Sequence, residues 1–207
     1  MNAPFRLSYS RLDAAKISKA GRKGLWMGGW AFALGCLVAA CSASEKKTSK
    51  EPAMKIQLTS TAFAEDKVIP VEHTGQGKDT SPPLKWSGVP AEAKSLALIA
   101  ADPDALVGTW AHWVLYDLPP TVTELAADTP KSQFIPGGAK QGVNDFRRLG
   151  YGGPMPPPGK PHHYFFKLYA LDKALDLKPG ATKLNVLKAM EGHILAEGQL
   201  MGTYQRK

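Results

Sequence analysis

Residues 108–119 read GTWAHWVLYDLP and place His112 between two tryptophans inside an otherwise apolar run. The aromatic and β-branched residues of this run favour a buried β-strand that ends near Asp117 and Pro119. A buried imidazole is costly unless it finds a hydrogen-bond partner. The polar groups that meet His112 must therefore come from segments elsewhere in the sequence.

Two other segments have the same strand-like character, namely SLALIAAD at residues 95–102 and HHYFFKLYALD at residues 162–172. Seventeen prolines and twenty glycines without a fixed period exclude collagen and a long helical bundle, and they favour short strands joined by turns. Near the C-terminus, Thr182 can cap a short helix with apolar residues spaced three apart, which Gly192 would end. The sequence predicts a mainly β domain.

The net charge of +8 is concentrated at the N-terminus, where the first 40 residues hold six Lys/Arg and one Asp. From Cys41 onward, twenty Lys/Arg and seventeen Asp/Glu are interspersed without a basic stripe, so we expect no nucleic-acid partner. The two cysteines of the chain, Cys36 and Cys41, both precede the predicted strands. The folded part therefore has neither a disulfide framework nor a thiol nucleophile.

The N-terminal segment has the pattern of an export signal. Arg22 and Lys23 precede a run of sixteen largely apolar residues, 25–40, whereas a membrane-spanning helix needs about 20. The run ends in Val-Ala-Ala-Cys at Cys41, which resembles the lipobox of bacterial lipoproteins. This resemblance implies a lipoprotein-type signal peptide at residues 1–40, acylation of Cys41, a polar tether at residues 41–53 and a folded domain at residues 54–207.

A lipidated Cys41 would anchor the exported protein to a membrane through its acyl chains. Ser42, the next residue, implies transfer to the outer membrane, with the domain facing the periplasm. Two alternatives remain open, an uncleaved anchor and an over-extended gene start. If the chain instead starts at Met54, the domain is cytoplasmic.

Each of the three strongest predicted strands carries a polar residue near one end, namely Asp102, His112 and His162. If these strands lie side by side, the three residues can share one pocket with aromatic walls, rimmed by the Gly/Pro-rich loop 134–161. Apolar walls with a few convergent polar groups are typical of a small-ligand site. Alternation of side chains along a strand predicts that His112 shares its face with Trp110, Val114 and Tyr116.

Two other interpretations of these residues stay open. A histidine in an apolar strand is often a core residue whose hydrogen bonds are satisfied, without any ligand. Two histidines and one carboxylate are also the ligand set of non-haem iron and of some zinc centres.

Six blocks of the sequence, in order, resemble the phosphatidylethanolamine-binding protein family, and in particular its bacterial Raf-kinase-inhibitor-like branch. The blocks run from about Met54 to Arg206 and are SPPLKWSGVP, AADPDA, WAHWVLYDLP, NDF, GYGGPMPPPGKPHHYFFKLYALD and ILAEGQLMGTYQR. The resemblance implies an antiparallel β-sandwich of two sheets with a few short peripheral helices. It also implies a pocket for a small anion, such as phosphate or a phosphoryl head group.

Position by position, the resemblance implies ligand-binding roles for seven residues: Asp102, Trp110, His112, Gly153, Pro154, His162 and Tyr164. The sequence departs from other members at two places. His163 replaces an arginine common in animal members and should point away from the pocket. Leu106 replaces a proline found in many members and would change the pocket rim.

The leading functional hypothesis is a non-enzymatic binding or regulatory protein that holds a small anionic ligand and needs no cofactor. No serine or cysteine nucleophile paired with a base and no phosphate-binding P-loop is recognisable in the sequence. The alternatives are a metal-binding protein that uses the two histidines and Asp102, and an inhibitor of a protease or kinase. No particular protein partner is indicated.

Overall fold

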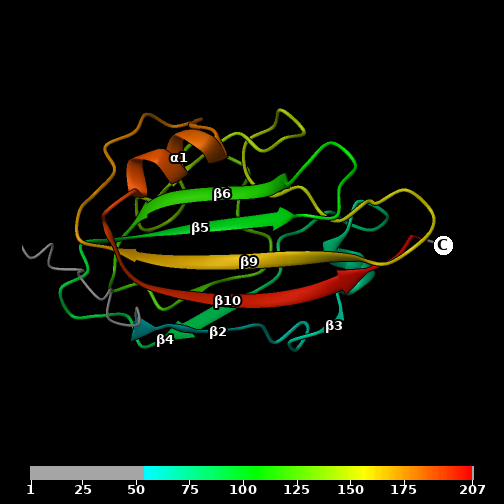
Figure 1. The fold of residues 1–207 in the computed structure, drawn as a ribbon, viewed down its shortest axis with the longest axis horizontal. Helices are drawn as coiled ribbons and strands as arrows, with labels where there is room; N and C mark the ends of the chain where they lie inside the picture. The colour runs from blue at the N-terminus through cyan, green and yellow to red at the C-terminus, as the bar shows by residue number, and fades with distance from the viewer. Residues whose placement is uncertain (1–53, 207) are drawn as a thin grey trace, which may run out of the picture. The chain divides into compact units, whose positions relative to one another are not determined.

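The structure is a computed structural model that describes residues 54–206 (Figure 1). The predicted signal peptide at residues 1–40, the lipidation site Cys41 and the tether at residues 41–53 lie outside the described residues. Within residues 54–206, no helix has both the length and the apolar character that crossing a membrane requires.

A large sheet contains the three strands predicted most strongly. Strand β5 (Ser95–Asp102) lies in the middle, with β6 (Trp110–Leu118) on one side and β9 (His162–Leu171) on the other, and all of these pairings are antiparallel. The remaining strands of this sheet are β10 (Ile194–Tyr204) next to β9, β8 (Lys140–Gln141) next to β6, and β1 (Met54–Lys55) and β3 (Lys67–Val68), both of which pair with β10. The adjacency of β6, β5 and β9 is the arrangement that the pocket hypothesis requires.

A smaller sheet of β2 (Gln57–Thr59), β4 (Leu84–Ser87) and β7 (Glu124–Leu125) faces the large one. The main core joins both sheets, because Leu58, Leu84 and Trp86 from the small sheet belong to the same buried cluster as Trp113 and Phe166 from the large sheet. The predicted β-sandwich is therefore confirmed. It is not purely antiparallel, since β1 and β3 run parallel to β10.

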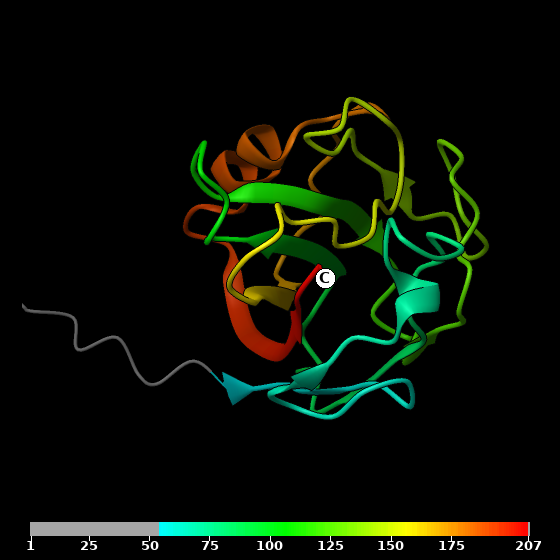
Figure 2. The same ribbon diagram turned by 90° about the vertical axis from the view of Figure 1, so that its right-hand side faces the viewer.

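The other face of the large sheet is partly covered by the helix α1 (Lys183–Met190), which lies over the β5 and β6 side in Figures 1 and 2. Thr182 caps this helix in a capping box with Asn185, so the predicted start of the helix is correct. The apolar residues spaced three apart, Leu184, Leu187 and Met190, do not form one buried face, because Leu184 and Leu187 are exposed and only Met190 is buried. Besides α1, the described residues hold one 3-10 turn, η1 (Val71–His73).

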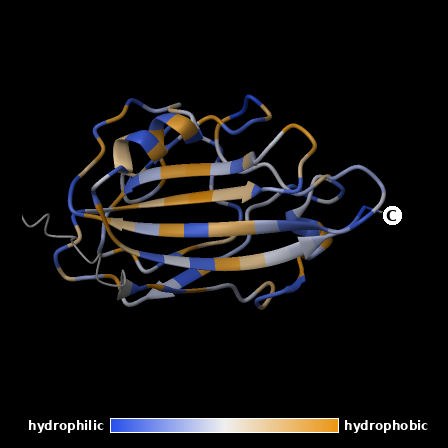
Figure 3. Ribbon diagram, viewed as in Figure 1, coloured by the Kyte–Doolittle hydropathy of each residue, from blue (hydrophilic) through white to orange (hydrophobic). Residues whose placement is uncertain are grey.

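A β-bulge places His112. Ala100 pairs with Trp113, whereas Ala101 pairs with Ala111, so His112 is the extra residue of β6 at this point. The bulge interrupts the alternation of side chains, and the prediction that His112 shares a face with Val114 and Tyr116 is therefore wrong. Those two side chains pack in the second cluster under α1. Figure 3 shows β5 as mostly apolar along its length, whereas β9 and β10 alternate hydrophobic and hydrophilic stretches.

Candidate functional site

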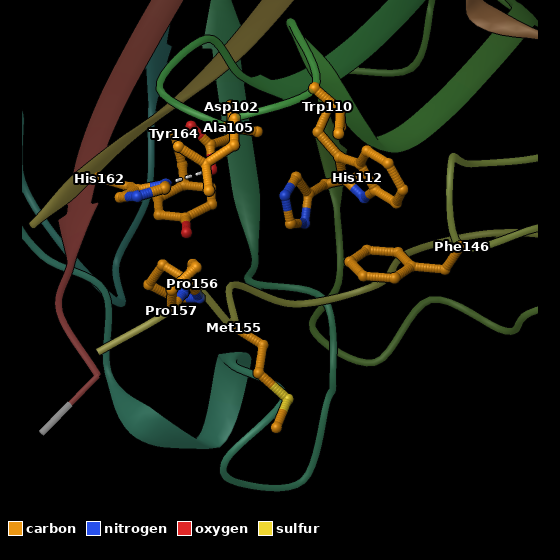
Figure 4. A pocket seen from close by; sticks show the side chains of 12 residues that line it. Asp102, Ala105, Trp110, His112, Phe146, Met155, Pro156, Pro157, His162 and Tyr164 are labelled. Carbon is orange, nitrogen blue, oxygen red and sulfur yellow. Dashed lines mark hydrogen bonds and ion pairs between the residues drawn. The ribbon is translucent and has the colours of Figure 1, made fainter. Parts of the chain in front are cut away.

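A pocket of about 230 Å³ opens at the end of the large sheet where β5 finishes and β6 and β9 begin (Figure 4). Five of the seven predicted site residues line this pocket, namely Asp102, Trp110, His112, His162 and Tyr164. They come from three neighbouring strands, as Figure 4 shows. The predicted convergence of the three strand ends is therefore present in the structure.

Asp102 and His162 form one wall of the pocket. Asp102 is the last residue of β5 and lies on the core face, two residues after Ala100. Its Oδ2 lies 2.7 Å from Nδ1 of His162, the first residue of β9, and its Oδ1 accepts a hydrogen bond of 2.8 Å from the amide of Asp104. The carboxylate thus fixes the orientation of the His162 ring and the start of the loop that follows β5.

His112 is held by Gly152 through two hydrogen bonds. The His112 Nδ1 lies 2.6 Å from the carbonyl oxygen of Gly152, and the amide of Gly152 donates to the backbone carbonyl of His112 at 2.9 Å. Because a carbonyl only accepts, the proton belongs on Nδ1, and Nε2 is left to face other groups. The ring makes edge contacts with Tyr164 and Phe146, with centroids 5.1 and 5.2 Å apart.

Burial sets the charge of His112. The side chain is 4% exposed, and this burial lowers the pKa of His112 below its ordinary value of 6.5. The hydrogen bond to Gly152 and the carboxylates of Asp102, Asp145 and Asp79 oppose this shift without cancelling it. At neutral pH the ring is therefore neutral, with a hydrogen on Nδ1 and a lone pair on Nε2.

Two buried donors in this pocket have no hydrogen-bond partner among residues 54–206, namely the indole Nε1 of Trp110 and the hydroxyl of Tyr164. Burial, followed by the nearby carboxylate of Asp102, raises the pKa of Tyr164, so its hydroxyl stays protonated. A buried polar group without a partner costs about 1–3 kcal/mol, and most such groups in proteins are satisfied. Both atoms stay closed off from solvent and without a hydrogen-bond partner among residues 54–206.

Gly153 and Pro154 do not line the pocket, contrary to the expectation that they contact the ligand. The amide of Gly153 donates to Oδ1 of Asp79 at 2.5 Å, and the carbonyl of Pro154 accepts from the amide of Gly75 at 2.9 Å. A Cβ at Gly153 would lie 2.6 Å from the carbonyl oxygen of His73, so only glycine allows this close approach. Both residues support the loop, and the amide of Gly153 is already bonded within the protein.

The structure adds pocket residues that sequence reasoning gave no role. The most central is Phe146, whose ring contacts both Trp110 and His112 and lies under the guanidinium of Arg148. Its place in the NDF block was the sequence signal that could have identified Phe146 as a pocket residue. Besides Leu106, which the sequence placed on the rim, the pocket is lined by Ala105, Val107, Met155, Pro156 and Pro157.

The family model for phosphatidylethanolamine-binding proteins matches residues 59–205, most of the described chain. The chain belongs to this family. Among relatives, the UPF0098 protein of Methanothermobacter thermautotrophicus is 52% identical over 151 residues, which are 73% of this chain and 99% of that protein. The UPF0098 protein of Chlamydia muridarum is 47% identical over 156 residues, again 73% of this chain and 99% of the relative.

Solved structures agree with this assignment to the phosphatidylethanolamine-binding protein family. A putative homologue of the family from Chlamydia trachomatis aligns with a TM-score of 0.68 at 44% identity, covering 75% of this chain and all of that one. E. coli YbcL, described as a new member of the mammalian family, aligns with a TM-score of 0.69 at 36% identity, covering 73% of this chain and 99% of its own.

His163 and Leu106, the two residues at which the sequence departs from other members, lie where the sequence analysis expected them. His163 points away from the pocket and bonds Asp104, whose Oδ2 accepts from both the backbone amide and Nδ1 of His163. Leu106 lies on the pocket rim and is 90% exposed. The rim of the pocket is therefore apolar at this position.

The metal-binding alternative has no support in the geometry. In the part of the chain that the structure describes, no group of three His, Cys, Asp or Glu residues is arranged to hold a metal ion. The Nδ1 atoms of both pocket histidines already bond protein oxygens, Asp102 for His162 and Gly152 for His112.

Proposed function

We propose that this domain is a non-enzymatic binding or regulatory module whose pocket takes a small anion, either phosphate or a phosphoryl head group. The observation that carries the proposal is that Asp102, His112 and His162, from three neighbouring strands, line one pocket with aromatic walls. Phosphoryl oxygens accept hydrogen bonds strongly, and a histidine ring nitrogen that carries a proton can donate to them.

The geometry of the pocket supports binding by preformed groups. His112 is fixed by its two hydrogen bonds to Gly152, and the rings of Trp110, Phe146 and Tyr164 contact one another or His112 at 5.1–5.5 Å between centroids. Side chains already locked by packing lose little conformational entropy when the ligand binds. The affinity for phosphate should fall as the pH rises through the pKa of His112. A protonated ring can donate from Nε2 to the anion, whereas the neutral ring cannot.

Calorimetric titration of inorganic phosphate into wild-type protein and into His112→Ala tests this proposal. We expect measurable binding to the wild type and a loss of about tenfold or more in affinity for the variant. The matched control is His193→Ala, because His193 bonds Asp172 and does not line the pocket. Equal phosphate binding by wild type and His112→Ala would contradict the proposal.

We also propose that the exported protein is held at the outer membrane, facing the periplasm, by acyl chains on Cys41. The support is the sequence alone, which places a lipobox-like ending directly after an apolar segment. Mass spectrometry of protein isolated from membranes should detect a mature N-terminus at an acylated Cys41, and Cys41→Ala should abolish that mass. A native chain that begins at Met54 would instead indicate a cytoplasmic protein.

A further inference from the structure

A second cavity lies on the outer face of the large sheet, on the side that carries α1. Its volume is about 370 Å³, which is within the range of small-ligand sites. Helix α1 borders this cavity, and β9 passes beside the helix in Figure 1. The lining of this outer groove includes Ile99, Phe165, Lys167, Tyr169, Lys183 and Leu187. No residue lines both the outer groove and the pocket of His112.

The floor of the outer groove is apolar and is already held in place by packing. Ile99 and Tyr169 are 5% and 8% exposed and belong to the cluster that packs under α1. Phe165 lies on the same face of β9 as Tyr169 and is half-buried. Leu187 of α1 is 37% exposed. An apolar ligand that covers Phe165 and Leu187 removes their surface from water, which is favourable.

Two lysines add positive charge to this apolar surface. Lys167 is exposed and lies on β9 between Phe165 and Tyr169, on the same face. Lys183 is the first residue of α1, and its ammonium group donates a hydrogen bond to the backbone carbonyl of Thr109. An ammonium group has three donors, so Lys183 has two more for a ligand. Among residues 54–206, neither lysine takes part in an ion pair.

No acidic residue lines the outer groove to balance these two charges. The first turn of α1 also contains no acidic residue, although the positive end of a helix dipole favours one there. Glu197 stands opposite Tyr169 on β10 and lines a neighbouring groove, within the described chain without an ion pair to Lys167. The outer groove therefore combines an apolar floor with a positive rim.

We propose that the outer groove binds a small apolar molecule that carries one carboxylate. The apolar body of this ligand covers Phe165 and Leu187, and its two carboxylate oxygens accept hydrogen bonds from Lys167 and Lys183. A neutral apolar molecule would cover the same floor but would leave both ammonium groups without a counter-charge. This binding site is separate from the proposed phosphate pocket and goes beyond that function.

Hydrocinnamate and its amide are suitable probes, because they have nearly the same shape and only the acid is charged at neutral pH. In a nitrogen-15 NMR titration of the full protein, hydrocinnamate should shift the amide signals of Phe165, Tyr169 and Leu187. It should bind about tenfold more tightly than the amide, since each exposed charge pair contributes about threefold and the two contributions add.

Lysine-to-methionine variants test the role of the charges, because methionine keeps an unbranched apolar stem without the ammonium group. Lys167→Met and Lys183→Met should each weaken hydrocinnamate binding about threefold, and the double variant should no longer distinguish the acid from the amide. Lys188→Met is the matched control, because Lys188 is also exposed on α1 but does not line the outer groove. It should bind hydrocinnamate as the wild type does.

The outcomes separate this inference from the proposed phosphate site. His112→Ala should still bind hydrocinnamate, and the Lys167→Met/Lys183→Met double variant should still bind inorganic phosphate. Equal affinity of the wild type for the two probes, or shifts confined to residues around His112, would overturn the inference and leave phosphate binding intact. Sedimentation of the same samples covers one other occupant. A dimer that forms through the outer groove and prevents the hydrocinnamate shifts would identify a second copy of the chain as the ligand, and would also overturn the inference.

Discussion

Two neighbouring histidines at the start of β9 make the same hydrogen bond in opposite surroundings. His162 bonds Asp102 and His163 bonds Asp104, and both Nδ1 to Oδ2 distances are 2.7 Å. The side chains of the first pair are 14% and 5% exposed, whereas those of the second are 47% and 41% exposed. Because side chains alternate between the two faces of a strand, the first pair lies at the pocket and the second pair faces solvent.

The comparison shows that two hydrogen bonds of the same length need not contribute equally to the free energy of unfolding. For the buried pair, loss of one partner leaves the other unsatisfied in a poorly hydrated site. For the exposed pair, water replaces the lost partner, and salt screens the charges. We therefore expect the buried pair to control both the stability and the shape of the pocket, and the exposed pair to contribute little to either.

The largest expected effect comes from Asp102→Ala. This change leaves His162 Nδ1 and the amide of Asp104 without their acceptor, and it should lower the free energy of unfolding by about 3 kcal/mol. Denaturant unfolding of wild type and variant measures the difference. Asp104→Ala is the matched control, and a loss as large as that of Asp102→Ala would contradict the role given to burial.

Much of the fold could be predicted from the sequence because the long strands are strongly apolar and end in turn-forming residues. Segments 95–102 and 162–172 appear as β5 and β9 with nearly the expected bounds. The bulge at His112 could not be predicted, because it depends on the register between β5 and β6 and not on composition. One extra residue was enough to separate His112 from Val114 and Tyr116.

The site residues that lie at strand ends could be predicted from the sequence. Asp102, His112 and His162 meet because their strands are neighbours, and Trp110 and Tyr164 follow from their strand positions. Loop residues were harder, because a loop's path depends on distant contacts. Gly153 does not line the pocket, and its amide bonds Asp79, which is far away in the sequence, whereas Phe146 from a neighbouring loop does line it.

His112 extends the comparison of the His162 and His163 pairs to a third case. It is a buried histidine whose partner is the carbonyl of Gly152 and not a carboxylate. Burial lowers its pKa in the folded protein below the 6.5 of the unfolded chain, so its contribution to stability is complete above pH 6.5 and is lost as the pH falls through the folded pKa. We expect unfolding free energies of the wild type to fall on acidification below pH 6.5.

The His112→Gln variant should lose this part of the pH dependence, and equilibrium unfolding at a series of pH values measures it. His193→Gln is the control, since His193 is only part-buried and bonds Asp172. An identical pH profile for wild type and His112→Gln would show that His112 does not stay neutral on folding.

The smallest expected effect belongs to the exposed pair. Asp104→Ala should cost less than about 1 kcal/mol, because water solvates both groups when the contact is lost. Hydrogen bonds from His163 lower the pKa of Asp104 below its ordinary value of 3.8, so the stabilisation is present above pH 3.8 and disappears as the pH falls through the lower, folded value. Unfolding curves of wild type and Asp104→Asn should therefore differ slightly at pH 6 and converge in strong acid. A difference that persists in strong acid would mean that Asp104 acts through its shape in the turn after β5, and not through its charge.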